Sequence, residues 1–211
     1  MTVGNWQAGV ALFIAGQMPV LFVSSGPGPA EAHPGATSAP SSSPPLRVPG
    51  SFNPLHDGHR QMAAVAQTLT GHPVTFELSI ENVDKPTLGE AEIVRRCRQF
   101  LGHHPLVLTR AQKFAEKARL FPGTTFIVGA DTIQRVGNSG YYKCAADFVA
   151  ALDCFVDLNC RFLVFGRHDI DKFVGLDSIP LPDRLRGRCI EVAESEFRMD
   201  ISSTELRGDA E

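Results

Sequence analysis

Two histidines stand in the segment GSFNPLHDGH, residues 50–59, at a spacing that suits anion binding. His56 and His59 are three residues apart at the expected start of a helix, so both imidazoles can face one ligand. Gly50 has no side chain and lets a phosphate approach the backbone, while the helix start at Gly58 offers free N–H groups and a favourable dipole. A single histidine in such a place is more often an exposed, capping or core residue. The pair in this setting predicts a phosphate clamp.

The segment ISSTELR, residues 201–207, offers a second set of donors near the other end of the chain. Its hydroxyl residues before Glu205 predict a helix start, whose exposed N–H groups suit a phosphate. Arg207 adds a planar, permanently charged donor fork. A capping pattern of this kind is also typical of an ordinary terminal helix. Beside the histidine pair, it offers a second set of groups that suit a phosphate.

Further polar groups follow two expected strand ends between these segments. In FIVGADTIQRVG, residues 126–137, a strand that ends at Gly129 lets an adenine or a ribose lie against the backbone. Asp131, just past that end, can accept hydrogen bonds or help to hold a metal ion. Arg167 follows the apolar run FLVF, where a nucleotide contact and a plain surface arginine are equally good interpretations.

Strand-like and helix-like segments alternate from Leu46 onward and determine where these residues lie. Apolar or β-branched runs predict strands over residues 46–52, 73–80, 106–109, 124–128, 162–165 and 189–192. Apolar residues at helical spacing predict helices after Gly58, over residues 90–101 and 111–120, and after the Tyr141–Tyr142 pair, whose rings we expect to pack in the core. This order predicts an α/β, Rossmann-like doubly wound parallel sheet with helices on both faces, which binds ligands beyond the carboxyl ends of its strands.

The first segment resembles the G-x-F-x-P-x-H-x-G-H signature of the nucleotidylyltransferase superfamily. The matching positions are Gly50, Phe52, Pro54, His56, Gly58 and His59. The last segment resembles the I-S-S-T-x-I-R motif of nicotinate and nicotinamide mononucleotide adenylyltransferases, with Leu206 in place of Ile. It is a poorer match to the R-T-E-G-I-S-T-S motif of cytidylyltransferases, which favours ATP over CTP. Residues 129–131 match the G-x-D element of the same superfamily.

The resemblance implies an adenylyltransferase that transfers AMP from ATP to nicotinamide or nicotinate mononucleotide, with release of pyrophosphate, in NAD synthesis. It implies Mg²⁺ as cofactor, with Asp131 as a candidate metal ligand. The implied catalytic residues are His56, His59 and Arg207. The implied ATP-binding residues are Gly50, Ser51, Phe52, Gly58, Gly129, Asp131, Arg167, Ser202, Ser203 and Thr204. The candidates for binding the mononucleotide are Asn82, Lys85 and Arg95, with Arg110 as a further one, whereas Arg96 and Arg98 are expected to be solvated surface charges.

Two departures from the family pattern leave other interpretations open. Pro49 stands where many adenylyltransferases have Gly, and it has no N–H to donate. The chain also ends at Glu211, shortly after Arg207. The alternatives are another nucleotidylyltransferase, which acts on phosphopantetheine or uses CTP, and a nucleotide-binding protein without catalysis.

The composition of the 211-residue chain gives no sign of a nucleic-acid or membrane partner. Its 20 basic and 23 acidic side chains leave a formal charge of -3, so any positive site is local, and we expect only small-molecule partners, ATP and a mononucleotide. The five cysteines are odd in number and form no C-x-x-C pair, which argues against a disulfide framework and a zinc knuckle. They favour a reducing compartment, the cytoplasm.

Residues 1–45 are expected to lie outside the catalytic domain, which we place at residues 46–211. The stretch 24–45 is rich in Gly, Pro, Ser and Ala and predicts a linker. The apolar residues from Val10 to Val23 are interrupted by Gly and Pro and have no preceding Lys or Arg, so neither a membrane segment nor a signal peptide is expected. They fit a docking strand or helix, or the remnant of an upstream module.

Overall fold

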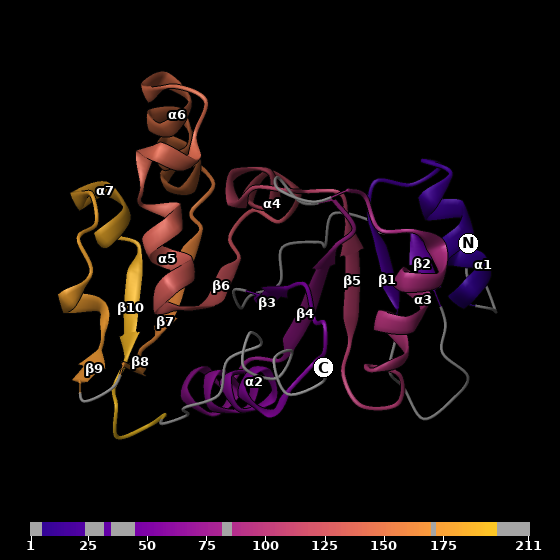
Figure 1. The fold of residues 1–211 in the computed structure, drawn as a ribbon, viewed down its shortest axis with the longest axis horizontal. Helices are drawn as coiled ribbons and strands as arrows, with labels where there is room; N and C mark the ends of the chain where they lie inside the picture. Colours follow the sequence, from indigo (N-terminus) through magenta and orange to yellow (C-terminus); the bar gives the residue numbers. More distant parts are fainter. Residues whose placement is uncertain (1–5, 24–31, 35–44, 82–85, 170–171, 198–211) are drawn as a thin grey trace.

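A mixed β-sheet lies at the centre of the protein (Figure 1). The computed structural model describes residues 6–23, 32–34, 45–81, 86–169 and 172–197, and these form an eight-stranded sheet in the order β10-β7-β6-β3-β4-β5-β1-β2. The strands are β1 Leu21–Val23, β2 Ala32–Pro34, β3 Leu46–Gly50, β4 Val74–Ser79, β5 Leu106–Thr109, β6 Thr125–Gly129, β7 Arg161–Phe165 and β10 Cys189–Val192. A separate antiparallel pair consists of β8 Arg167–Asp169 and β9 Lys172–Val174.

Helices connect most of these strands. The α-helices are α1 Trp6–Ile14, α2 Asp57–Thr70, α3 Glu90–Arg98, α4 Phe114–Leu120, α5 Ala130–Val136, α6 Ala145–Asp157 and α7 Asp183–Arg186. Short 3-10 turns cover Ser139–Tyr141, labelled η1, and Leu176–Ser178, labelled η2. Among the described residues, none of the helices has the length and apolar character that a membrane crossing requires.

Strands β3, β4, β5, β6, β7 and β10 of this sheet run parallel to one another, as predicted. β3 pairs in parallel with β4 and β6, β4 pairs with β5, β6 with β7, and β7 with β10. The central strands are buried on both faces, which matches their β-branched and aromatic composition. The α/β doubly wound prediction is therefore confirmed for this part of the sheet. β1 differs, because it pairs antiparallel with both β5 and β2 and so makes the sheet mixed.

Helices cover both faces of the sheet, and the alternation of side chains along each strand divides the core in two. Ile127 of β6 belongs to the apolar cluster that α1, α2 and α3 share. Its neighbours Phe126 and Val128 point the other way, into the cluster that α4, α5, α6 and α7 share. Each strand of the parallel part is thus held from both sides, which fixes where its carboxyl end lies.

The apolar N-terminal segment packs onto the sheet as both a helix and a strand. Val10 and Phe13 of α1 and Leu21 of β1 are fully buried in the same cluster as α2 and α3. Arg110, at the end of β5, donates hydrogen bonds to the carbonyl oxygens of Phe13 and Ile14, at 3.0 and 2.8 Å. Because the last carbonyls of a helix lack partners within it, this arginine caps α1.

Among the differences from the predicted elements, two boundaries have local reasons and one helix was missed. β3 ends at Gly50 because Phe52 takes a left-handed backbone conformation, with φ 46°. α4 begins at Phe114, later than the predicted residue 111. The Glu116 carboxylate accepts hydrogen bonds from the backbone N–H groups of Gln112 and Lys113, which fixes the start of the helix there. α5, which follows β6 without a loop, was absent from the prediction.

Candidate functional site

The carboxyl ends of β3 and β6 flank the point where the strand order reverses direction, and such points are the usual ligand sites of doubly wound sheets. β3 pairs with β4 along its whole length, but with β6 only through Leu46–Thr125 and Arg47–Phe126. Beyond that pairing the two strands leave room for a cavity of about 230 Å³. Its lining residues are Val48, Pro49, His56, Gly58, His59, Met62, residues 127–132, Phe165, Gly166, Arg167 and Phe197.

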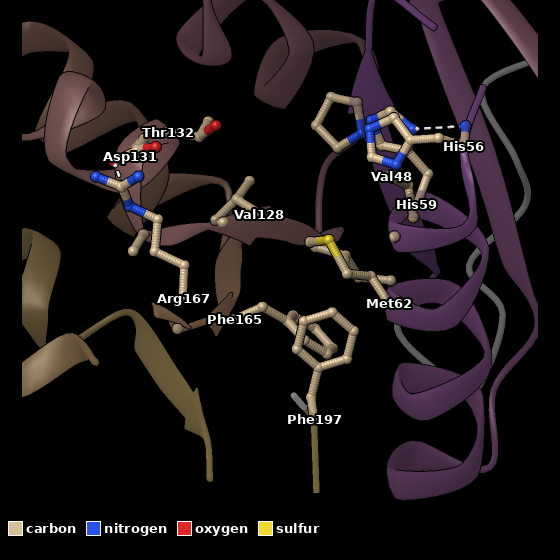
Figure 2. A pocket seen from close by; sticks show the side chains of 16 residues that line it. Val48, His56, His59, Met62, Val128, Asp131, Thr132, Phe165, Arg167 and Phe197 are labelled. Atoms are coloured by element: carbon tan, nitrogen blue, oxygen red, sulfur yellow. Dashed lines mark hydrogen bonds and ion pairs between the residues drawn. The ribbon is translucent and has the colours of Figure 1, made fainter. Parts of the chain in front are cut away.

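The predicted histidine pair forms one wall of this cavity (Figure 2). His56 is the N-cap of α2, with extended φ and ψ of -123° and 171°, and His59 lies in the first turn. The two ring centroids are 3.8 Å apart. The backbone N–H of His56 donates to Nδ1 of His59 at 3.4 Å. In the neutral imidazole this bond places the His59 proton on Nε2, where it is a donor for an anion.

Burial keeps both imidazoles neutral before a ligand arrives. Burial, together with smaller contributions from the neighbouring His56 and Arg60, lowers the pKa of His59 to about 3. Burial also lowers the pKa of His56, although Asp57 opposes that shift. A bound polyphosphate would favour the charged form of each ring, and the N-terminus of α2 adds its own positive potential. The wall is therefore built to receive negative charge.

Phe52 supports this wall from beneath rather than lining the cavity. Its side chain is 1 % exposed, and its ring meets His59 edge-on at 5.1 Å between centroids. A Cβ at Gly50 would come within 2.7 Å of the Phe52 ring. The ring of Phe52 therefore gives a steric reason for glycine at position 50. Neither Gly50 nor Ser51 is among the lining residues.

The opposite wall comes from β6, α5 and the end of β7 (Figure 2). Gly129 is the N-cap of α5, and a Cβ there would meet nothing within 4 Å, so the space in front of it is open. Asp131 lies in the first turn of α5, and its Oδ1 is 3.2 Å from Nε of Arg167. Both side chains are about half exposed, at 55 % and 47 %. Both therefore lie on the cavity wall as an ion pair that a ligand can reach.

Apolar residues that the sequence did not single out for the site form the floor between the walls (Figure 2). Met62 lies on α2, one turn after His59. Phe165, the last residue of β7, packs edge-on against Phe197, with 4.8 Å between centroids. Phe165 was visible in the sequence as the end of a buried strand, but nothing near Phe197 marked it as a cavity residue. Such a floor suits a flat base or ribose.

The cavity offers one carboxylate, Asp131, among its described lining residues. The described residues contain no group of three or more His, Cys, Asp or Glu side chains that could hold a metal ion by itself. Mg²⁺ commonly binds through one or two carboxylates together with water and substrate phosphates. Asp131 therefore fits a magnesium ion that arrives with a nucleotide.

A second, more polar hollow of about 240 Å³ adjoins the first and shares Asp131 with it. The other lining residues are Gln134, Arg135, Asn138 and Tyr141. Tyr141 is 54 % exposed, whereas Tyr142 is half-buried and donates its hydroxyl proton to the carbonyl oxygen of Val136. Core packing was thus the correct prediction for Tyr142 and the wrong one for Tyr141.

Several predicted residues lie elsewhere or outside the described part of the chain. Arg95 is on α3, where it binds Glu92 and Asn53, and it does not line either hollow. Arg96 is only 8 % exposed, so the prediction of a solvated surface charge is wrong for it. The following predicted site residues lie outside the described residues: Asn82, Lys85, Ser202, Ser203, Thr204 and Arg207.

In a comparison with protein families, residues 48–209 match the model described as cytidylyltransferase-like. The match begins in β3 and takes in both walls of the cavity. No curated protein matches the chain.

Proposed function

Because the chain belongs to the cytidylyltransferase-like family of nucleotidyltransferases, we propose that it transfers AMP from ATP to nicotinamide or nicotinate mononucleotide and releases pyrophosphate. The observation that carries this proposal is the position of His56 and His59, whose rings face a cavity at the strand switch point, across from Gly129 and Asp131.

The reaction is an in-line displacement at phosphorus. A phosphate oxygen of the mononucleotide attacks the α-phosphorus of ATP, a new P–O–P bond forms, and the bond from the α-phosphorus to the bridging oxygen of pyrophosphate breaks. A phosphate monoester is already ionised near neutral pH, so no general base is needed. The protein has to align the reactants and stabilise the charge that develops.

The described residues suit these tasks. His59 presents its Nε2 proton, and the N-terminus of α2 supplies a second source of positive potential for the triphosphate. Arg167 can exchange Asp131 for a phosphate oxygen, because their ion pair is exposed and such pairs contribute at most about 1 kcal/mol. Asp131 would hold Mg²⁺, which neutralises phosphate charge when it is bound.

The choice of ATP and of the acceptor rests on other features. ATP is favoured by the segment ISSTELR, residues 201–207, whose Arg207 we propose as a catalytic residue. We propose the polar hollow next to Asp131 as the place of the mononucleotide, since it adjoins the nucleotide cavity and offers the charged group of Arg135. Arg95 is less suited to that role, because Glu92 and Asn53 already engage its guanidinium.

One observation favours a second candidate, a nucleotide-binding protein without catalysis. Pro49 lines the cavity and has no N–H to donate to a phosphate. In that case ATP binds but no pyrophosphate appears with any acceptor.

An acceptor screen tests the proposal. The purified chain with Mg²⁺ is given ATP or CTP, paired with nicotinamide mononucleotide, nicotinate mononucleotide, phosphopantetheine or phosphocholine, and pyrophosphate release is measured. We expect release with ATP and one of the two pyridine mononucleotides. Turnover with CTP or with another acceptor replaces the substrate assignment, and ATP binding without turnover supports the second candidate.

A further inference from the structure

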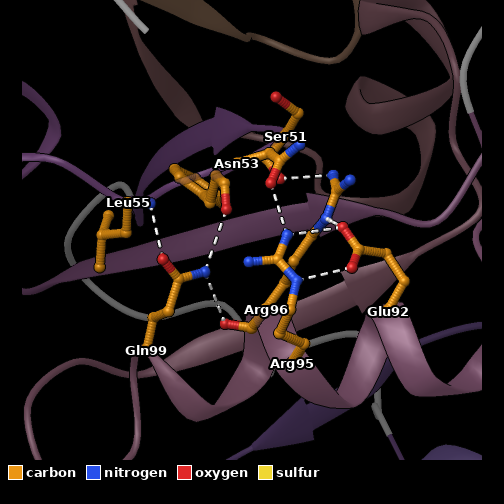
Figure 3. Close-up of polar contacts among 8 residues, drawn as sticks. Ser51, Asn53, Leu55, Glu92, Arg95, Arg96 and Gln99 are labelled. Atoms are coloured by element: carbon orange, nitrogen blue, oxygen red, sulfur yellow. Dashed lines mark hydrogen bonds and ion pairs between the residues drawn. The ribbon is translucent and has the colours of Figure 1, made fainter. Parts of the chain in front are cut away.

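The loop that carries the chain from β3 to His56 is held by side chains from α3, a helix that does not reach the cavity (Figure 3). Nη1 of Arg96 donates to the carbonyl oxygen of Ser51 at 2.7 Å. Nε2 of Gln99 donates to the carbonyl oxygen of Phe52 at 3.0 Å, and its Oε1 accepts from the N–H of Leu55 at 2.8 Å. Arg96 of α3 and Gln99, the C-cap residue of that helix, thus satisfy three backbone groups of residues 51–55.

Glu92 holds the arginines of this helix in place. Its Oε1 accepts from Nε of Arg96 at 2.7 Å, and its Oε2 accepts from Nε of Arg95 at 2.6 Å. The hydrogen bond from Arg95 contributes most, and together with that from Arg96 it lowers the pKa of Glu92 to about 2. The carboxylate is therefore charged at neutral pH. Arg95 in turn donates to Oδ1 of Asn53, which adds a side-chain contact to the loop.

The loop needs external support because its backbone cannot satisfy itself. Phe52 has a positive φ of 46°, a conformation that a bulky residue rarely adopts, and it interrupts the strand pattern there. The groups that Arg96 and Gln99 bind are those left without a strand or helix partner around this residue. Without the two side chains, nothing else among the described contacts holds these backbone groups in place.

The loop also determines where both imidazoles lie. The Phe52 ring packs against His59 from beneath, and His56 follows directly after Leu55, whose N–H binds Gln99. A displacement of the loop therefore moves both imidazoles at once. In enzymes, a misplacement of about 1 Å can cost roughly 100-fold in rate.

We propose that Arg96 and Gln99 are positioning residues, which fix residues 51–55 from α3 so that His56 and His59 are preorganised for the transition state of nucleotidyl transfer. The catalytic part of this inference rests on the proposed function. Because the two residues act on geometry and touch no substrate, their loss lowers kcat more than it raises KM.

Gln99→Met tests the proposal, because methionine fills the same volume without either hydrogen bond. We expect kcat to fall about 10- to 100-fold while KM for ATP changes less than about threefold. Arg98→Met is the matched control, since Arg98 is an exposed arginine on the same helix, and it should keep the wild-type kcat. Arg96→Lys keeps the positive charge but cannot donate to Glu92 and to the Ser51 carbonyl oxygen at the same time as the guanidinium does, so it should give an intermediate kcat. This variant also serves as the test if Gln99→Met does not fold.

Two NMR measurements test the positioning role without any turnover. In Gln99→Met, hydrogen exchange at the Leu55 amide should become faster, while amides in the centre of β4 keep their protection. The titration of the His59 ring should move from its lowered pKa toward the ordinary value of about 6.5.

The outcomes separate this inference from the proposed function. If the wild-type chain transfers no nucleotide, the proposed function fails, and the two NMR measurements alone decide whether α3 positions the histidines. Unchanged Leu55 exchange and His59 titration in Gln99→Met overturn the positioning role. The positioning role is also overturned if Gln99→Met loses no more kcat than Arg98→Met does, or if its loss of kcat only equals its loss of folded protein.

Discussion

The two walls of the cavity are built in opposite ways. The wall of His56 and His59 rests on the buried ring of Phe52 and on a loop that α3 holds with several hydrogen bonds. The wall of Asp131 and Arg167 consists of two half-exposed side chains joined by one ion pair. The comparison indicates that the first wall is preformed, whereas the second can rearrange around a nucleotide and its metal ion. The predictions below separate these two behaviours.

The largest effect is expected on the preformed wall. His59→Ala removes a donor aimed at the developing charge, and such a loss typically costs about 2.7–4 kcal/mol, or roughly 100- to 1000-fold in kcat. Pyrophosphate release measures the rate, and a thermal melt should show that the variant still folds. His103→Ala, at an exposed histidine that does not line the cavity, is the control. Wild-type turnover in His59→Ala would refute the role of this wall.

A similar loss is expected for Arg207→Ala, although Arg207 lies outside the described residues. If its guanidinium binds the same triphosphate as the histidines, its removal should lower kcat by roughly 100-fold through lost charge stabilisation. The double variant His59→Ala/Arg207→Ala should then lose less than the product of the two single effects, since groups that act on one charge are not additive. Fully multiplicative losses would indicate separate sites.

A smaller effect is expected on the adjustable wall. Arg167→Gln should raise KM for ATP about tenfold, because a hydrogen bond to a charged group contributes about 1.5 kcal/mol. Its melting temperature should stay close to that of the wild type, since the exposed pair with Asp131 contributes little to stability. Arg161→Gln, at the exposed opposite end of β7, is the control for surface charge. An unchanged KM would place Arg167 outside the ATP site.

A separate effect, on stability rather than on rate, depends on pH. The pKa of His59 in the folded chain is lowered to about 3, from an ordinary value near 6.5, so the unfolded chain binds the proton more readily. The stability that follows from this difference is fully present above pH 6.5 and is lost as the pH falls toward 3. His59→Gln should therefore lose less stability than the wild type between pH 6.5 and 4 in urea denaturation. An identical pH dependence would show that His59 is not the group responsible.

The parallel sheet and the histidine wall were predictable because local sequence encodes them. Runs such as TTFIV and FLVF are short and rich in β-branched and aromatic residues, which favours buried strands, and the predicted strands agree with β5, β6 and β7 to within one residue or so. Whether His56 and His59 face the same side depends only on where α2 begins, and the helical pattern predicted that start as well. Gly129 and Asp131 followed from the end of β6.

Other features could not be predicted because they depend on contacts between distant segments. α5 begins without a Ser, Thr, Asp or Asn cap and spans only Ala130–Val136, too short for a clear periodicity. The burial of Arg96 requires Glu92 on one side and the carbonyl oxygen of Ser51 on the other. The helical spacing of Arg96 with the buried residues Ile93 and Phe100 was the one sequence signal for it.

The antiparallel strand β1 has a consequence for the solubility of this fold. β1 occupies the outer edge of β5, with Leu21, Phe22 and Val23 opposite Leu108, Val107 and Leu106. A chain shortened to residues 46–211 would present β5 as an apolar edge strand with unpaired N–H and C=O groups, which is a template for pairing with other molecules. By pairing with β5, the N-terminal segment thus protects the sheet against aggregation. This role is independent of the chemistry in the cavity between β3 and β6.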